Sequence, residues 1–304
     1  MNDTPEAPLA VRGFDDRNRQ FTRLTERALR KRVDRLTDGR SEWIVLHRVP
    51  FAPHDCMQAS GDPENGLVLV SYRVGDEPWM EAALDPDVAA DVFVAWARNE
   101  PGWEDAHPWA PADWWDPVEV PAPSPEAAAE ATVLAARYLE EGYLSFDAMV
   151  QALEEMSESE EPITRAQARE ILAPMWRERV AAQVDWGVTD CDRLTEAFAE
   201  LDRGGIVARE HFACCQSCGT AEIWAEASDD DRGYVFFHMQ DTESAHEGVL
   251  FLAYGSRSDE PEATVAIGRE VVKTLREHGF RTAWDESERT RIQITDLEWR
   301  KRLP

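Results

Sequence analysis

Residues 233–238 read Gly-Tyr-Val-Phe-Phe-His, and this short apolar run marks a change in the pattern of the chain. Tyr234–His238 and a second run, Val249–Tyr254, have the length and the aromatic and β-branched content of buried strands. Upstream of both runs, apolar residues recur at the spacing of amphipathic helices, in the segments 126–141, 145–156, 164–185 and 190–202. Helices followed by strands predict an α+β fold for this part of the chain.

Signals at the ends of segments support the same reading. Thr189 with Asp192 forms a variant of the capping box, and Gly204-Gly205 ends the helix that begins there. After the two buried strands, Pro261–His278 has the periodicity of a helix, and two short strands are predicted at 281–284 and 291–295. Residues 126–304 are therefore predicted to be a helical region followed by a mixed α/β sheet domain.

The clearest linker is 118–125, Val-Glu-Val-Pro-Ala-Pro-Ser-Pro, whose prolines make it semi-rigid. It divides the chain into a domain at 1–117 and a domain at 126–304, in agreement with a length of 304 residues. The first domain is predicted to be a small α+β domain. Its expected elements are a basic amphipathic helix at 16–36, strands at 43–49 and 67–74, a helix at 85–99 and a tryptophan-rich segment at 103–115 that packs over the sheet.

The formal net charge of −28 is unevenly distributed, because residues 1–40 carry a net charge of +3. Such an acidic chain repels nucleic acid, whose binding depends on Lys and Arg contacts to phosphate, and it suits a basic protein partner. No apolar run approaches the roughly 18 residues that a membrane helix needs, and the first ten residues lack a signal-peptide core. With only five cysteines, a cytoplasmic protein with reduced thiols is expected.

The distinctive chemistry lies in Cys214-Cys215-Gln216-Ser217-Cys218-Gly219. A Cys-x-x-Cys-Gly turn suits zinc, because two thiolates converge where the glycine lets the chain bend. Structural zinc takes four ligands and no second Cys-x-x-Cys exists, so the sequence leaves the completing ligands open. The candidates are Cys214, Cys191, His211 and His238, and one such set is Cys191, Cys215, Cys218 and His238.

Two other interpretations of the cysteines stay open. They are small buried hydrophobic residues, or Cys215 and Cys218 are a redox pair with a helix over 220–227. A thioredoxin-like motif directly follows a strand in a βαβ unit, whereas this motif is predicted to follow a helical region.

His238 and Asp241 form a second candidate site at the end of the buried strand. A His, Gln, Asp and Glu together can serve acid–base chemistry or hold a metal. The alternative is that Asp241 or Thr242 caps a short helix and His238 is a hydrogen-bonded core residue.

Four segments together resemble an uncharacterised bacterial family, the domain-of-unknown-function family 6891. The segments are 189–194, 205–209, 212–219 and 233–243, and the closing Trp299-Arg300-Lys301-Arg302 is similar as well. The resemblance covers about residues 125–304 and implies a recurring unit. It implies no activity, substrate or cofactor.

The sequence contains no Gly-rich phosphate loop and no nucleophile elbow. The leading hypothesis is therefore a non-enzymatic, acidic binding or regulatory protein, with zinc as the candidate cofactor. The alternative is an enzyme with a thiol- or metal-based site around Cys215, Cys218, His238 and Asp241.

Overall fold

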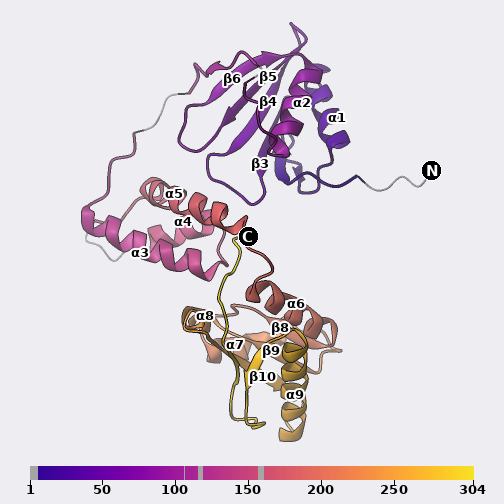
Figure 1. Cartoon of the computed structure of the whole chain (residues 1–304), viewed down its shortest axis with the longest axis vertical. Helices are drawn as coiled ribbons and strands as arrows, with labels where there is room; N and C mark the ends of the chain where they lie inside the picture. Colours follow the sequence, from indigo (N-terminus) through magenta and orange to yellow (C-terminus); the bar gives the residue numbers. More distant parts are fainter. Residues whose placement is uncertain (1–5, 106, 116–118, 157–160) are drawn as a thin grey trace, which may run out of the picture. The chain divides into compact units, whose positions relative to one another are not determined.

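The computed structural model describes residues 6–105, 107–115, 119–156 and 161–304. Val118, the first residue of the predicted linker, lies outside these ranges. The chain forms two compact units, Met1–Thr132 with Phe146–Ala181, and Val133–Ser145 with Ala182–Pro304 (Figure 1). We call them unit 1 and unit 2. Helices and two sheets confirm the α+β class, while the division at 118–125 stays a prediction.

Unit 1 contains an antiparallel sheet that runs, in its described residues, in the order β2-β1-β3-β4-β5-β6-β7. The strands are β1 (Val11–Asp15), β2 (Gln20–Phe21), β3 (Trp43–Arg48), β4 (Cys56–Asp62), β5 (Leu67–Arg73), β6 (Met80–Leu84) and β7 (Ala110–Pro111). The predicted strands at 43–49 and 67–74 are confirmed as β3 and β5. They are separated in the sheet by β4, whose Asp62 pairs with Leu67 across the turn.

Helices α1 (Glu26–Thr37) and α2 (Pro86–Ala97) share one core with this sheet. The basic helix predicted at 16–36 starts later than expected, because Gln20–Phe21 forms β2 and Thr25 caps α1 by accepting from the Ala28 N–H. Leu29, Val33 and Leu36 are fully buried. The helix thus buries its apolar face within its own unit, as its amphipathic pattern suggested.

The tryptophan-rich segment covers part of unit 1, as predicted. Tyr72 of β5 packs against both Trp103 and Trp109, with ring centroids 4.7 and 4.8 Å away in edge-to-face geometry. The segment is thus held both by the packing of these rings and by the short strand β7, which pairs with β6.

Three helices follow, α3 (Pro125–Glu141), α4 (Phe146–Glu155) and α5 (Arg165–Gln183). α4 and most of α5 belong to unit 1. Phe146 lies 5.7 Å from the ring of Phe51, and the Trp176 indole donates to the Phe51 carbonyl over 2.6 Å. These contacts attach the two helices to the loop after β3.

Unit 2 is built around a sheet whose described strands run in the order β11-β12-β10-β9-β8. Its elements are α6 (Asp190–Arg203), β8 (Ile206–Arg209), α7 (Gln216–Glu222), the 3₁₀ turn η1 (Ile223–Ala225), β9 (Gly233–Phe236), α8 (Met239–Ala245), β10 (Val249–Ser256), α9 (Pro261–Glu277), β11 (Arg281–Ala283) and β12 (Ile292–Thr295). The predicted capping box at Thr189 and Asp192 is present at the start of α6. β8 is parallel to β9, and the other neighbours are antiparallel.

The two faces of this sheet carry different helices, because successive strand residues point to opposite sides. Val235 and Phe237 pack with α6 and α9 in the larger core. Phe236 packs on the other face, in a smaller core with Ile223 of η1. The cysteine cluster therefore belongs to the layer formed by α7, opposite α6 and α9.

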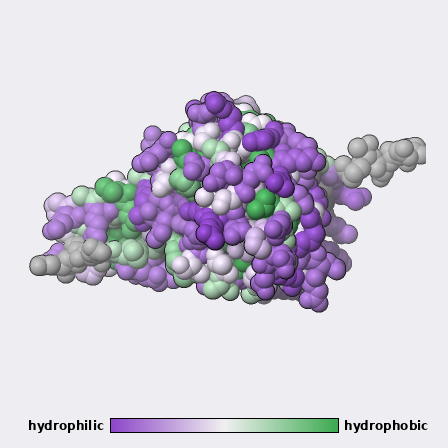
Figure 2. All heavy atoms as spheres, turned by 90° about the horizontal axis from the view of Figure 1, so that it is seen from below, coloured by the Kyte–Doolittle hydropathy of each residue, from purple (hydrophilic) through white to green (hydrophobic). Residues whose placement is uncertain are grey.

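Charged and polar residues cover most of the face shown in Figure 2, with apolar residues scattered among them. Among the described helices, none has both the length and the apolar character needed to cross a bilayer.

Candidate metal centre

The loop between β8 and α7 carries the first cysteine and is held by backbone hydrogen bonds to the segment that joins β9 to α8. The Phe212 N–H donates to the Phe237 carbonyl over 2.8 Å, and the Met239 N–H donates to the Ala213 carbonyl over 3.1 Å. His211 and Ala213 have φ angles of 50° and 59°, a left-handed conformation that non-glycine residues adopt only where the surroundings impose it. The loop therefore turns sharply and places Cys214 at a fixed distance from the sheet.

The other two cysteines lie at the start of α7. Cys215 is the N-cap residue with extended backbone, and Cys218 follows three residues later in the first turn. Gly219 comes next and packs against the ring of Phe236, where a Cβ atom would lie 2.4 Å from a ring carbon. Glycine at this position lets α7 approach β9 closely.

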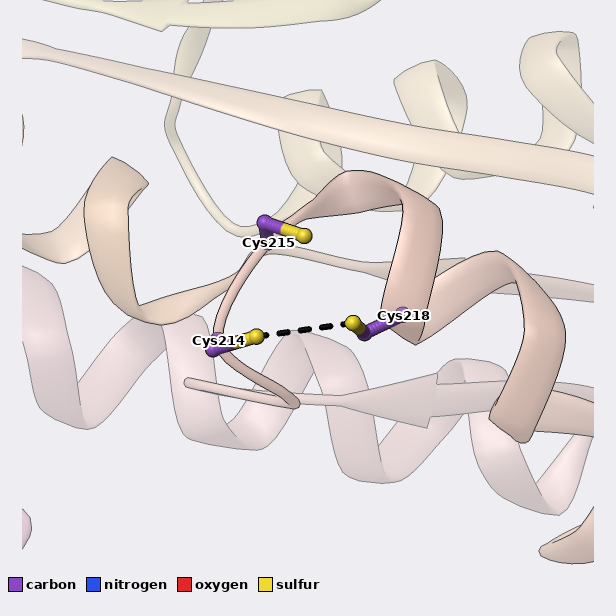
Figure 3. Close-up of side chains that lie close together, drawn as sticks. All are labelled: Cys214, Cys215 and Cys218. Atoms are coloured by element: carbon purple, nitrogen blue, oxygen red, sulfur yellow. Dashed lines mark hydrogen bonds between the residues drawn. The ribbon is translucent and has the colours of Figure 1, made fainter.

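The three sulfur atoms lie within 4.8 Å of one another, and the Cys214 thiol donates to the Cys218 sulfur over 3.5 Å (Figure 3). Zinc binds thiolates at about 2.3 Å, which places the sulfurs of a tetrahedral site about 3.8 Å apart. The cluster is therefore close to the spacing that three zinc ligands require. Cys214 is exposed and the other two are partly exposed, so an ion can reach them from solvent.

The pKa values of Cys215 and Cys218 move in opposite directions. The backbone N–H of Cys218, with the neighbouring thiols, lowers the pKa of the Cys215 thiol. Side-chain hydrogen bonds with Cys214 and Cys215, and the charges of these two thiols, raise the pKa of Cys218 to about 12. Of these two thiols, Cys215 therefore ionises before Cys218, and a cation that binds the cluster displaces the protons that remain.

Cys191, a predicted ligand, lies on the opposite face of the sheet. It is 1% exposed and packs in the core with α6, α9, Val235 and Phe237. Burial raises the pKa of its thiol to about 12. Cys191 thus behaves as a small core residue, and it is outside the group of three close sulfurs.

His238, the other predicted ligand, is also outside that group, since the described residues show a cluster of close ligand atoms only at Cys214, Cys215 and Cys218. Its ring Nε2 lies 3.1 Å from the Asp241 carboxylate, and both side chains are more than nine-tenths buried. Burial lowers the pKa of the imidazole, opposed by the Asp241 charge.

Asp241 has a structural function at the start of α8. Its carboxylate accepts from the His238 backbone N–H over 3.1 Å and from Arg291 over 2.5 Å. The predicted Asp241 or Thr242 cap is therefore shifted, because His238 is the N-cap residue and Asp241 is the third helical position. Arg291 also donates to the Phe251 carbonyl. This arginine, 50 residues away, carries no sequence signal that links it to Asp241.

His211 belongs to a polar network that sequence reasoning did not identify. Its ring stacks on Tyr143 at 4.4 Å, and its Nδ1 lies 2.9 Å from the Thr242 hydroxyl. The Tyr143 hydroxyl donates to Glu210, which also accepts from Lys301 over 2.7 Å. Burial lowers the pKa of His211 to about 4, so the ring is neutral at neutral pH. Because its Nδ1 faces the Thr242 hydroxyl, this nitrogen is not available as the fourth ligand of a zinc ion.

No curated protein and no solved structure matches this chain significantly. The model of one family does, the Domain of unknown function (DUF6891), over residues 124–303. This range contains the whole of the cysteine cluster, the His238–Asp241 contact and the network around Tyr143. The resemblance of residues 125–304 is thereby confirmed, and the chain belongs to the DUF6891 family.

Proposed function

We propose that this protein binds one zinc ion through the thiolates of Cys214, Cys215 and Cys218, and acts as a non-enzymatic binding or regulatory protein. The observation that carries the proposal is the convergence of three partly exposed sulfurs within 4.8 Å. Thiolates are the ligands that zinc and other soft cations prefer. The cluster of three cysteines offers no carboxylate oxygen to an ion such as Mg²⁺.

The fourth coordination position comes from outside the cluster in this proposal. Cys191 lies on the other face of the sheet, and His238 and His211 are engaged with Asp241 and Thr242. A water molecule or an external ligand then completes the tetrahedron, as in zinc sites that keep an open position. Such a site suits exchange with a partner better than it suits a purely structural ion.

A basic protein partner fits the charge of the chain. The net charge of −28 creates an attractive field for cationic surfaces and accelerates encounter at low salt. In this proposal the acidic surface recruits the partner, and the partner or water supplies the fourth ligand.

The alternative is an enzyme that uses Cys215, Cys218, His238 and Asp241. It is less well supported, because Asp241 already accepts from Arg291 and from the backbone of His238. These contacts explain its burial without any catalytic function.

The test is zinc binding by the full-length reduced protein, measured by competition with a chromophoric chelator. We expect about one zinc per chain, and an affinity at least tenfold weaker after Cys214→Ser, Cys215→Ser or Cys218→Ser, since even indirect support of a metal site contributes about that factor. Cys56→Ala, in β4 of unit 1, is the matched control.

Two further variants distinguish the proposed site from the ligand set predicted from sequence. Cys191→Ala and His238→Ala should leave the zinc affinity unchanged. Reduced wild-type protein that holds no zinc would contradict the proposal. If Cys191→Ala or His238→Ala abolishes binding, the three-thiolate site is wrong and the closed four-ligand site is right.

A further inference from the structure

We propose that Cys214 and Cys218 form a reversible disulfide that empties the metal site. The inference rests on the proposed zinc site, and it adds a modification that controls it. Its starting point is the 3.5 Å contact between the two sulfurs, in which one thiol already points at the other (Figure 3). A disulfide bond is about 2.05 Å long, so the sulfurs have only about 1.5 Å to move.

The contact is held on both sides by the fold. On one side, the Ala213 carbonyl accepts from the Met239 N–H, which anchors the residue before Cys214. On the other side, Gly219 packs against the fully buried ring of Phe236, which anchors the residue after Cys218. The two thiols therefore stay close without any bound ion.

The position in the chain is one that redox motifs use. The prediction that the motif follows a helical region was wrong, since β8 ends at Arg209 and the next element is α7. β9 then returns parallel to β8, so the cysteines lie in the connection of a βαβ unit. Cys-x-x-Cys redox motifs lie in such connections. That spacing belongs here to Cys215 and Cys218, while the 3.5 Å contact joins Cys214 to Cys218.

Exposure directs oxidation to this pair. Cys214 is exposed, whereas Cys56 and Cys191 are buried, with 8% and 1% of their surface exposed. Cys215 also contacts Cys218, but it is only partly exposed, whereas Cys214 is exposed and lies 3.5 Å from the Cys218 sulfur. An oxidant in solution therefore meets Cys214 first, and Cys218 is the thiol that follows.

A hydroperoxide supplies the oxidising equivalents. The Cys214 thiolate attacks one oxygen of hydrogen peroxide, an S–O bond forms, the O–O bond breaks, and hydroxide leaves and takes up a proton. The Cys218 sulfur then attacks the sulfenic sulfur, an S–S bond forms, the S–O bond breaks, and a second water leaves with the remaining thiol proton. Two thiols lose two electrons to one peroxide, which becomes two waters.

The disulfide removes two of the three proposed zinc ligands. A single thiolate, Cys215, cannot hold the ion against water, because affinity at such sites depends on several deprotonated ligands acting together. Reduction by a dithiol restores both thiolates and the site.

The experiment treats zinc-loaded, full-length protein with hydrogen peroxide and follows three quantities. These are zinc released to a fluorescent indicator, free thiols in the denatured protein, and the disulfide connectivity found by peptide mass mapping. We expect release of about one zinc per chain and loss of two thiols. The mapped disulfide should join Cys214 to Cys218, and dithiothreitol should reverse all three changes.

Variants separate the inference from its alternatives. Cys214→Ser should prevent the two-thiol loss, and Cys56→Ala should leave it unchanged. A disulfide that joins Cys215 to Cys218, or zinc that stays bound after the Cys214–Cys218 bond has formed, would overturn the inference while the proposed zinc site stands. If the reduced protein binds no zinc at the outset, the proposed function fails, and mapping of the metal-free protein then shows separately whether Cys214 and Cys218 pair.

Discussion

Glu141, the last residue of α3, has a buried carboxyl group and is 6% exposed. Burial raises its pKa to about 7, and Arg137, whose guanidinium lies 3.7 Å away, only partly opposes this effect. The folded state therefore prefers the protonated acid. Glu141 opposes folding whenever the solution is alkaline enough to ionise it.

The sign of the pH dependence follows from this shift. The ordinary pKa of about 4.5 in the unfolded chain lies below the folded value of about 7. Between these pH values the unfolded state loses its proton first, so this group makes the free energy of unfolding fall as pH rises and then level off above about 7. We expect Glu141→Gln to be neutral near pH 4 and to stabilise the protein at pH 8, by about 1–3 kcal/mol.

Urea unfolding of both proteins at several pH values measures this difference. Glu140→Gln, at the exposed neighbouring position, should change the free energy of unfolding by less than about 0.5 kcal/mol at every pH. A Glu141→Gln effect that does not grow between pH 4 and pH 8 would show that the carboxyl ionises normally in the folded protein.

Residue types alone predicted the cysteine cluster, but they could not select which other residues would complete a zinc site. Cys214, Cys215 and Cys218 are close in sequence, so a single turn brings them together. Cys191 was an equally reasonable ligand by type, and its exclusion depends on which face of the sheet it occupies. The alternation of side chains along β8 and β9 and the packing of α6 decide that face. Neither can be read from residue types alone.

At the scale of elements, long periodic segments were predicted well, and the short strands expected at 281–284 and 291–295 are present as β11 and β12, but β8 was missed. The helix expected at 261–278 is α9 at Pro261–Glu277. β8, by contrast, has only four residues, Ile206–Arg209, directly after a double glycine that ends α6. Its strand conformation depends on the parallel pairing with β9, a contact between residues about 27 positions apart. Because β8 was not predicted, the βαβ unit that contains the cysteines was not predicted either.

The docking of α7 onto β9 gives a prediction at this scale. Gly219→Ala introduces a Cβ atom 2.4 Å from the Phe236 ring, and that ring is fully buried and cannot move away cheaply. We expect a loss of about 1–3 kcal/mol in the free energy of unfolding, together with weaker zinc binding because Cys218 shifts with the helix.

The matched control is Gly187→Ala, where a new Cβ atom meets nothing within 4 Å. It should change the stability by less than about 0.5 kcal/mol. Denaturant unfolding and the zinc competition assay, applied to both variants, measure the two effects. Equal stability of the two variants would mean that α7 does not pack tightly on β9.

At the scale of the whole molecule, the sequence and the structure divide the chain differently. The proline-rich linker predicts a separate domain at 126–304, and the family match begins at 124. In the structure, however, Phe146–Ala181 groups with the N-terminal sheet. Prolines indicate a stiff connection, but they do not indicate which surface the following helices pack against.

The contacts of α4 and α5 explain this grouping. Phe146 and Trp176 are 2% and 0% exposed, and both contact Phe51 of the N-terminal part. Arg177 adds an ion pair with Asp76 over 2.6 Å. A fragment that starts at residue 126 loses both partner residues, Phe51 and Asp76, and with them all three contacts, so two large aromatic side chains become uncovered. Exposing such side chains costs about 1.5–3 kcal/mol each.

We therefore expect a fragment of residues 126–304 to fold in its sheet region but to loosen in α4 and α5. Hydrogen exchange measured by mass spectrometry should show faster exchange at 146–181 in the fragment than in the full chain, with unchanged protection in β9 and β10. The full-length variant Phe51→Ala should produce a weaker form of the same change, since it removes one partner and keeps the rest. Equal protection of α4 and α5 in the fragment and in the full chain would instead establish 126–304 as an autonomous domain, and the boundary at the proline-rich linker would be correct.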